Sequence, residues 1–242
     1  MIKAFWHKTK NVGDTLTPIL LEYFTGEKVE FTERNEQGKL VGVGSIISGV
    51  RDNDIVWGAG CISETENIRQ YQNVKYLAVR GKLTEKKLGI TCGVYGDPAL
   101  LLPLLYNPKI EKKYKVGFIP HYADKNHPFV NKIKNDEGVK IIDIKQDYKT
   151  FIDEVLSCKD IVSSSLHGII IAEAYGIPAM WLKLSDLVLG NGFKFMDYLS
   201  GTGRIANNPP VGGMIVLQPI KNLKEIQDKL INSLKNYVAT RN

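Results

Sequence analysis

The chain has little cysteine and no cysteine pair. Its 242 residues include three cysteines, Cys61, Cys92 and Cys158, and none of them stands in a CxxC motif. Clustered cysteines are what a structural zinc site or a disulfide framework requires. We therefore expect no metal, no disulfide framework, and buried thiols in a reducing compartment.

Long apolar runs and blocks of like charge are also missing. No apolar stretch approaches the roughly 18 residues that a membrane-spanning helix needs. The first residues, MIKAFWHKTK, lack the apolar segment of a signal peptide. The formal net charge of +6 is spread along the chain, which disfavours a nucleic-acid-binding arm. We expect a cytoplasmic protein, held at most peripherally at the inner membrane face by basic residues.

What the chain does have is an alternation of strand and helix patterns. A hydrophobic content of 43% and a charged content of 24% allow a sizeable core and argue against disorder. The alternation predicts an α/β fold with two Rossmann-like domains, residues 1–105 and 106–242, facing a cleft. A polar, Lys-rich stretch at 105–115 indicates the linker, and an apolar stripe at 222–238 predicts a closing helix that packs across the domains.

The segment 158–182 organises the rest, because it predicts a strand, a loop, a buried helix and a second strand. Ser163, Ser164 and Ser165 end the first strand, and serines there usually cap the following helix. His167 falls in the first turn of that helix, at the edge of the sheet where open α/β folds bind ligands. A helix N-terminus attracts anions, and an imidazole beside it can exchange protons near neutral pH. The spacing alone fits equally well a simple serine cap with His167 packed in the core.

Polar and glycine-containing loops follow the predicted strands of the first half. Glycine lets a backbone approach either a ligand or the next helix closely. Asp14 suits the cleft, but it or Thr15 can also cap the helix that follows. The residues assigned to these cleft loops are Asn11, Gly13, Gly44, Gly58, Gly60 and Asp97.

Three further side chains stand near strand or helix ends. Arg80 ends the strand predicted at 74–79, where a buried charge needs either an acidic partner or an anionic ligand. Asp97 is expected first of all to cap a short helix that begins with Pro98. His121 follows the strand at 116–120 as His7 follows the first strand, and a surface histidine is the alternative.

The segment SSSLHG, followed by IIIAEAYGIP, resembles the C-terminal motif of the polysaccharide pyruvyl transferases. NVGD at 11–14, VRGKLT at 79–84, GDPAL at 96–100 and the two short glycine stretches match the same family. The resemblance covers most of residues 1–200, and its form is nearest to the short exopolysaccharide ketal-pyruvate transferases. One departure is Gly81, since family members often carry an acidic residue after the arginine.

The resemblance implies a glycosyltransferase-B-like (GT-B-like) arrangement and transfer of pyruvate from phosphoenolpyruvate to a sugar diol, as a cyclic ketal. It implies no metal and no cofactor, and an oligosaccharide acceptor, taken to be lipid-linked, as the second substrate. It also implies that Arg80 binds the donor, and Lys194 is the best match for a donor-holding lysine. Arginine, lysine and N–H groups at a helix start are the groups that phosphate and carboxylate call for. The residues expected to contact the donor are therefore Arg80, Ser163, Ser164, Ser165, Leu166 and Lys194.

His167 is the candidate acid and base, with Asp14, His121 or Glu173 as a second proton carrier. Glu173 lies nearly two helical turns beyond His167, so we rank it last. Two other functions stay open at this point, a nucleotide-sugar glycosyltransferase and a non-catalytic sugar-binding protein of a polysaccharide pathway. The acceptor sugar and the oligomeric state are not defined by the sequence.

Overall fold

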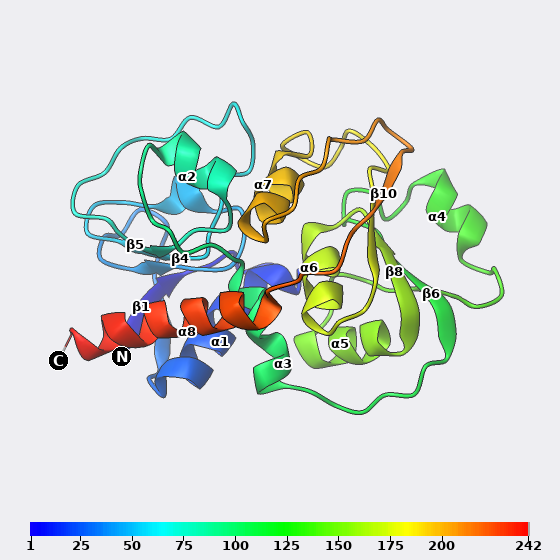
Figure 1. Ribbon diagram of the computed structural model, residues 1–242, viewed down its shortest axis with the longest axis horizontal. Coiled ribbons are helices and arrows are strands. Elements are labelled where there is room, and N and C mark those ends of the chain that lie inside the picture. The colour runs from blue at the N-terminus through cyan, green and yellow to red at the C-terminus, as the bar shows by residue number, and fades with distance from the viewer. Residues whose placement is uncertain (242) are drawn as a thin grey trace.

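The computed structural model describes residues 1–241, which build two five-stranded sheets joined by helices (Figure 1). The first sheet has the order β2-β1-β3-β4-β5, and all its strands are parallel. Its strands are β1 (Ile2–Phe5), β2 (Val29–Phe31), β3 (Leu40–Val41), β4 (Ile55–Trp57) and β5 (Lys75–Ala78).

The second sheet has the order β10-β9-β8-β6-β7, with an antiparallel β10 at one edge. Its strands are β6 (Tyr114–Ile119), β7 (Val139–Ile141), β8 (Cys158–Ser163), β9 (Ala179–Leu182) and β10 (Met214–Val216). Numbered within each half, both sheets have the order 2-1-3-4-5. This order reverses direction between β1 and β3 and again between β6 and β8. Ligands of open α/β sheets bind at such reversal points, beyond the carboxyl ends of the strands.

Helices cover both faces of each sheet. The α-helices are α1 (Leu16–Thr25), α2 (Lys82–Leu88), α3 (Leu102–Leu105), α4 (Pro128–Ile133), α5 (Tyr148–Leu156), α6 (Leu166–Ala174), α7 (Phe193–Gly201) and α8 (Leu223–Ala239). Three 3-10 helices accompany them: η1 (Gly13–Thr15), η2 (Ile47–Gly49) and η3 (Pro98–Leu101).

Strand β4 is buried on both faces because each face meets a different hydrophobic cluster. Trp57 of β4 packs into the cluster that holds α1, α5, α6 and α8. Its neighbour Val56 points the other way and joins Leu88 of α2. The first of these clusters contains residues of both halves, including Leu20 of α1 and Ile169 of α6. The two sheets therefore share one continuous core.

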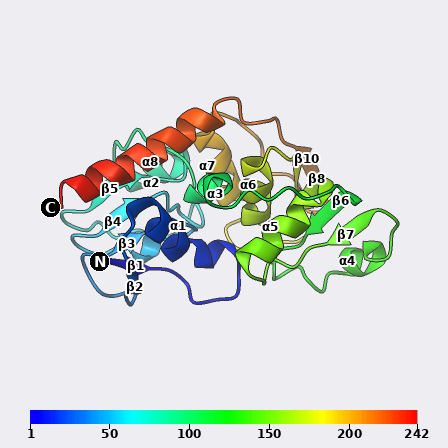
Figure 2. The same ribbon diagram turned by 90° about the horizontal axis from the view of Figure 1, so that it is seen from below.

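The closing helix α8 crosses back from the second half and lies along the first sheet, beside α1 (Figures 1 and 2). Leu230 and Leu234 are fully buried there, and the indole N–H of Trp57 donates to the Leu230 carbonyl at 3.0 Å. The start of β1 and the end of α8 consequently lie at the same end of the molecule (Figure 2). Because α7 and α8 contact the first half, a domain division at residue 105 stays a prediction.

The α/β class and most elements agree with the sequence-based expectation, and each end of α8 differs by one residue from the apolar stripe predicted at 222–238. The strand order differs from the six-stranded Rossmann order 3-2-1-4-5-6. The sequence does not predict the two edge strands β2 and β10, because each has only three residues and none of them is buried. Within residues 1–241, no helix combines the length and the apolar character needed to cross a membrane.

Candidate functional site

A cavity of about 250 Å³ lies where loops from the carboxyl ends of both sheets meet. The loops after β1, β3, β4, β6 and β8 and the segment entering α7 all contribute to it. The lining residues are His7, Asn11, Asp14, Ser45, Ile46, Ile62, His121, Tyr122, Ser165, Leu166, His167, Leu189 and Lys194. The order of the strands reverses between β1 and β3 and between β6 and β8, and the loops after all four of these strands line the cavity. The cavity therefore adjoins the reversal points of both sheets. Beside it the two halves are hydrogen-bonded, since Val12 N–H donates to the Ile144 carbonyl at 2.9 Å.

The three serines before α6 have different tasks. Ser163 Oγ donates to the Ile119 carbonyl at 2.9 Å, and Ser164 Oγ donates to Asp124 Oδ2 at 2.7 Å. These bonds tie the end of β8 to the loop after β6. Ser165 occupies the N-cap position of α6 but makes no capping hydrogen bond with its side chain. The expectation of a serine cap is therefore wrong, and the hydroxyl of Ser165 belongs to a residue that lines the cavity.

His167 lies in the first turn of α6, and its side chain is 12% exposed. It lines the cavity instead of packing wholly in the core. The loop after β1 approaches the ring so closely that a Cβ at Gly13 would lie 1.9 Å from His167 Nδ1. On the opposite side of the ring, Nε2 is 3.8 Å from Asp97 Oδ2. Gly13 and Asp97 thus confine the imidazole without lining the cavity themselves.

Asp97 has the capping role that the sequence predicts. Its Oδ1 accepts from the Ala99 N–H at 2.9 Å at the start of η3. The side chain is fully buried, and the remaining oxygen, Oδ2, faces His167.

Lys194 lies in the first turn of α7 and lines the cavity although it is only 8% exposed. Burial lowers its pKa to about 8, and nearby Arg80 acts in the same direction, whereas Asp14 and Asp124 raise the pKa. In the described part of the chain its ammonium forms no ion pair. A buried charge of this kind is stabilised by an anion.

His121 is buried beside the same cavity. Its Nδ1 accepts from the Ala123 N–H at 3.2 Å, so the neutral ring carries its proton on Nε2. Burial lowers the pKa of His121 to about 3, assisted by Lys194, His167 and Lys145. These features favour a neutral hydrogen-bond donor at this position over a group that gains and loses protons near pH 7.

Arg80 is fully buried and does not line the cavity. Its Nε donates to Asp197 Oδ2 at 2.9 Å, Nη1 to Ser45 Oγ at 2.6 Å, and Nη2 to the Cys61 carbonyl at 2.6 Å. Of the two partners that the sequence allowed, the structure thus supplies the acidic one. Arg80 touches the cavity through Ser45, and donor binding by its guanidinium stays a prediction.

The same region explains why glycine, and not the acidic residue that the resemblance leads one to expect, follows Arg80. A Cβ at Gly81 would lie 1.8 Å from the Asp197 carbonyl oxygen of α7, so no side chain fits there. The Asp197 carboxylate also accepts from the N–H and the hydroxyl of Thr84, both at 2.7 Å. Asp197 of α7 therefore supplies, from 117 residues away, the negative charge beside Arg80.

The remaining glycine positions have local structural reasons, which are close packing at Gly58 and Gly60 and backbone conformation at Gly44. Gly58 has a φ of +86°, and a Cβ there would lie 2.2 Å from Pro98 Cδ. A Cβ at Gly60 would lie 2.4 Å from Arg80 Cζ. Gly44 has a φ of +113° immediately before Ser45, a conformation that glycine adopts without strain. None of the three lines the cavity.

The loop after β1 differs in one detail from expectation. Asn11 Oδ1 accepts from the Gly13 N–H at 3.0 Å, which closes a turn. Asp14 accepts from the Thr9 hydroxyl at 2.6 Å instead of capping α1, and Thr15, at the N-cap of α1, makes no side-chain cap either. Both Asn11 and Asp14 line the cavity.

Sequence reasoning missed several residues near the site. Ser45 had a signal, because it directly follows a glycine at a strand end. Asp124 and Asp197 had none, since their partners Ser164 and Arg80 lie far away in the sequence. Glu173, ranked last as a proton carrier, points away and pairs with Arg204 and Tyr198.

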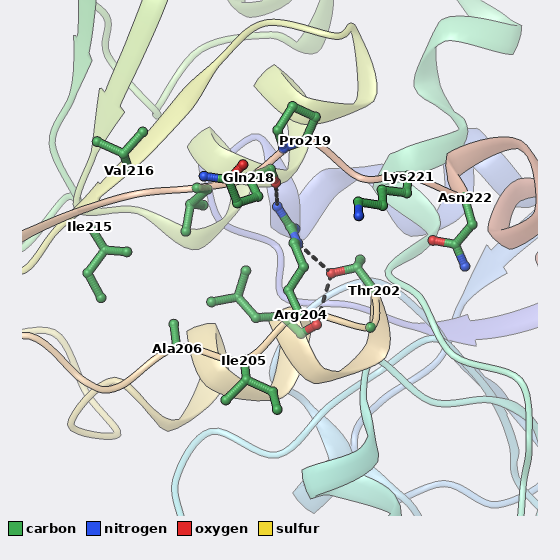
Figure 3. A pocket seen from close by; sticks show the side chains of 13 residues that line it. Thr202, Arg204, Ile205, Ala206, Ile215, Val216, Gln218, Pro219, Lys221 and Asn222 are labelled. Atoms are coloured by element: carbon green, nitrogen blue, oxygen red, sulfur yellow. Dashed lines mark hydrogen bonds between the residues drawn. The ribbon is translucent and has the colours of Figure 1, made fainter.

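A second cavity, of about 460 Å³, surrounds Arg204 near β10 and holds none of the predicted site residues (Figure 3). The Arg204 guanidinium already contacts Glu173, the Thr202 hydroxyl and the Gln218 carbonyl. Among residues 1–241 no group of three His, Cys, Asp or Glu side chains could hold a metal ion.

Comparison with known proteins agrees with the motifs. Residues 68–186 match the family model described as polysaccharide pyruvyl transferase. The uncharacterized protein L143 of Acanthamoeba polyphaga mimivirus is 33% identical over 214 residues, covering 82% of this chain and 73% of that protein. The succinoglycan biosynthesis protein ExoV of Rhizobium meliloti is 26% identical over 203 residues, covering 80% of this chain and 62% of that protein. No solved structure matches. The chain belongs to the polysaccharide pyruvyl transferase family.

Proposed function

We propose that this protein transfers pyruvate from phosphoenolpyruvate to a sugar diol, forming a cyclic ketal and releasing phosphate. The observation that carries the proposal is Lys194, a buried cation that faces the cavity and forms no ion pair within residues 1–241. The start of α6 lines the same cavity.

The cavity offers the groups that a small polyanion requires. The first N–H groups of α6 have no acceptor within the helix, and the helix dipole favours negative charge at that end. The hydroxyl of Ser165 and the ammonium of Lys194 add two further donors, from two different elements. Phosphoenolpyruvate carries a phosphate and a carboxylate, so it can engage both the helix start and the lysine at once.

The reaction also needs proton transfer. The methylene carbon of the donor gains one proton, and each of the two sugar hydroxyls loses one as its oxygen bonds to the central carbon. The second of these protons leaves with the phosphate. His167 is the group that carries protons between these positions, while neutral His121 donates a hydrogen bond. Asp14, which also lines the cavity, is the candidate for the second proton carrier.

The acceptor is an oligosaccharide, lipid-linked at the inner membrane face in this proposal. The support is the family and the name of the Rhizobium relative, which concerns synthesis of a polysaccharide. Loops from both sheets line the cavity, as expected if the halves face each other in a GT-B-like manner.

Two measurements test the proposal. Calorimetric titration with phosphoenolpyruvate should show binding to the wild type and at least tenfold weaker binding to Lys194→Met, because one charged contact is lost. Phosphate release should then require a saccharide acceptor, whose mass should rise by one pyruvate less one water. Binding of a nucleotide sugar in place of phosphoenolpyruvate would replace this proposal with glycosyl transfer.

A further inference from the structure

Two buried polar atoms face each other beside the cavity, and neither has a hydrogen-bond partner within residues 1–241. They are Asp97 Oδ2 and His167 Nε2, and they are 3.8 Å apart. The Asp97 side chain is fully buried, and burying a polar group without a partner costs free energy. An orphaned pair of this kind calls for a specific explanation.

We propose that Asp97 is a positioning residue that accepts a hydrogen bond from His167 Nε2–H and so leaves Nδ1 of the imidazole without a proton. The separation of 3.8 Å is about 1 Å longer than a formed N–H···O bond. Catalytic hydrogen bonds commonly tighten only when substrate is bound, and such tightening would close this gap. The tautomer is inferred independently of the proposed function, and only the reaction in which the unprotonated Nδ1 takes part rests on that function.

The surroundings of the ring favour Nδ1 as the reactive nitrogen. Nε2 is sealed from solvent on the Asp97 side. Nδ1 makes no hydrogen bond within residues 1–241 and is not among the buried atoms without a partner, so it keeps exposure toward the cavity that the imidazole lines, whereas Gly13 covers the face of the ring. A base at Nδ1 therefore lies on the side from which a substrate hydroxyl approaches.

The charges around the imidazole give the carboxylate a second effect. His167 is faced by Asp97 from the loop before η3, by Asp14 from η1, by Lys194 from α7 and by His121 from the loop after β6. The ammonium of Lys194 disfavours a second positive charge in the cavity, whereas the nearby carboxylates favour it. Asp97 thus stabilises the imidazolium that forms when Nδ1 takes a proton.

The test uses Asp97→Asn, which keeps the size of the side chain and an oxygen that can cap η3. An amide can donate as well as accept, so it no longer selects one tautomer. Nitrogen NMR of the imidazoles, at about pH 9, where an ordinary histidine is neutral, reads the tautomer without substrate. The chain has four histidines, and His167→Asn identifies the signal. We expect the Nε2–H form in the wild type, and a mixture or the Nδ1–H form in Asp97→Asn.

Kinetics supply the second readout. With donor and acceptor saturating, kcat of Asp97→Asn should fall by about 10²–10⁴, the scale of a lost proton carrier or a wrong tautomer. The calorimetric affinity for phosphoenolpyruvate should change much less. Asp147→Asn is the matched control, because Asp147 caps α5 through Lys149 N–H and Thr150 N–H and touches no imidazole. It should leave both readouts unchanged.

Two results would overturn the inference. One is a wild-type His167 that carries its proton on Nδ1, which can be observed even if the Asp97 variant fails to fold. The other is an Asp97→Asn protein with the wild-type tautomer and wild-type kcat, which would leave Asp97 as a cap alone. The tautomer is measured without donor or acceptor, so its result does not depend on whether phosphoenolpyruvate is the donor.

Discussion

Lys194 gives the cavity a titrating cation in an accessible pH range. Its pKa is lowered to about 8, so the ammonium is mostly charged at pH 7 and is lost as pH rises through 8. The affinity for phosphoenolpyruvate, measured by calorimetry, should therefore be highest below pH 8 and fall above it. The bound anion raises the pKa of Lys194, so the affinity falls at a somewhat higher pH than the pKa of the free protein indicates.

The Lys194→Met variant should bind phosphoenolpyruvate weakly, and its affinity should not change in this way between pH 7 and 9.5. The cysteines do not interfere, because burial raises the pKa of all three thiols, that of Cys61 to about 12. Lys132→Met, on an exposed part of α4, is the control and should behave as the wild type. A wild-type affinity that stays constant across pH 8 to 9.5 would remove Lys194 from the donor site.

His121 should make the protein sensitive to acid. Its pKa is about 3 in the folded protein against a reference value of 6.5, so the unfolded chain binds the extra proton first as pH falls. The free energy of unfolding should consequently decrease as pH drops from 6.5 toward 3. His121→Asn can still accept the Ala123 N–H, as asparagine does in turns, but does not titrate. Urea unfolding at pH 7 and pH 5 should show a smaller decrease in the variant; an equal decrease would mean that His121 is not held neutral.

Much of the site could be predicted residue by residue, because strand ends and helix starts are visible in the sequence. His167, Lys194, Asp14, Asn11, His121, Ser165 and Leu166 all line one cavity, although their roles stay predictions. The surroundings of Arg80 could not be predicted, since its carboxylate partner comes from a different element far along the chain. The different hydrogen bonds of the three serines also depend on tertiary neighbours that a local pattern does not reveal.

At the level of elements, η1 positions the catalytic candidate by contact. A methyl group at Gly13 would overlap three atoms of the His167 ring at 1.9–2.3 Å, so Gly13→Ala must displace the imidazole. We expect a folded protein whose kcat falls toward that of His167→Asn, with thermal melting as the check on folding. If both substitutions act through the imidazole ring, kcat of the double variant Gly13→Ala with His167→Asn should be no lower than kcat of His167→Asn alone. Additive losses would show that Gly13 acts elsewhere.

The elements themselves were predicted best where periodicity is long. The 17-residue helix α8 shows this, because its apolar residues recur at helical spacing along its whole length. The edge strands β2 and β10 are short and half exposed, so propensity and burial give little signal. Which sheet α8 covers is decided by contacts such as that of Trp57 with Leu230, between residues 173 positions apart.

For the whole molecule, the buried pair of Arg80 and Asp197 joins the first half to α7. Both side chains are fully buried, and Gly81 and Gly201 allow the two backbones to touch. Removing one partner leaves an uncompensated buried charge, which typically costs about 3–5 kcal/mol. Asp197→Ala should therefore lower the free energy of urea unfolding by about that amount.

A double variant separates the charge effect from the packing effect. Arg80→Met combined with Asp197→Leu removes both charges and keeps apolar volume, so it should recover the part of the lost stability that comes from the unpaired charge, while the loss of the two Thr84 hydrogen bonds remains. The exposed pair Lys224 and Asp228 on α8 is the control, and Asp228→Ala should leave the unfolding midpoint nearly unchanged. Single variants as stable as the wild type would show that the two halves do not depend on this pair.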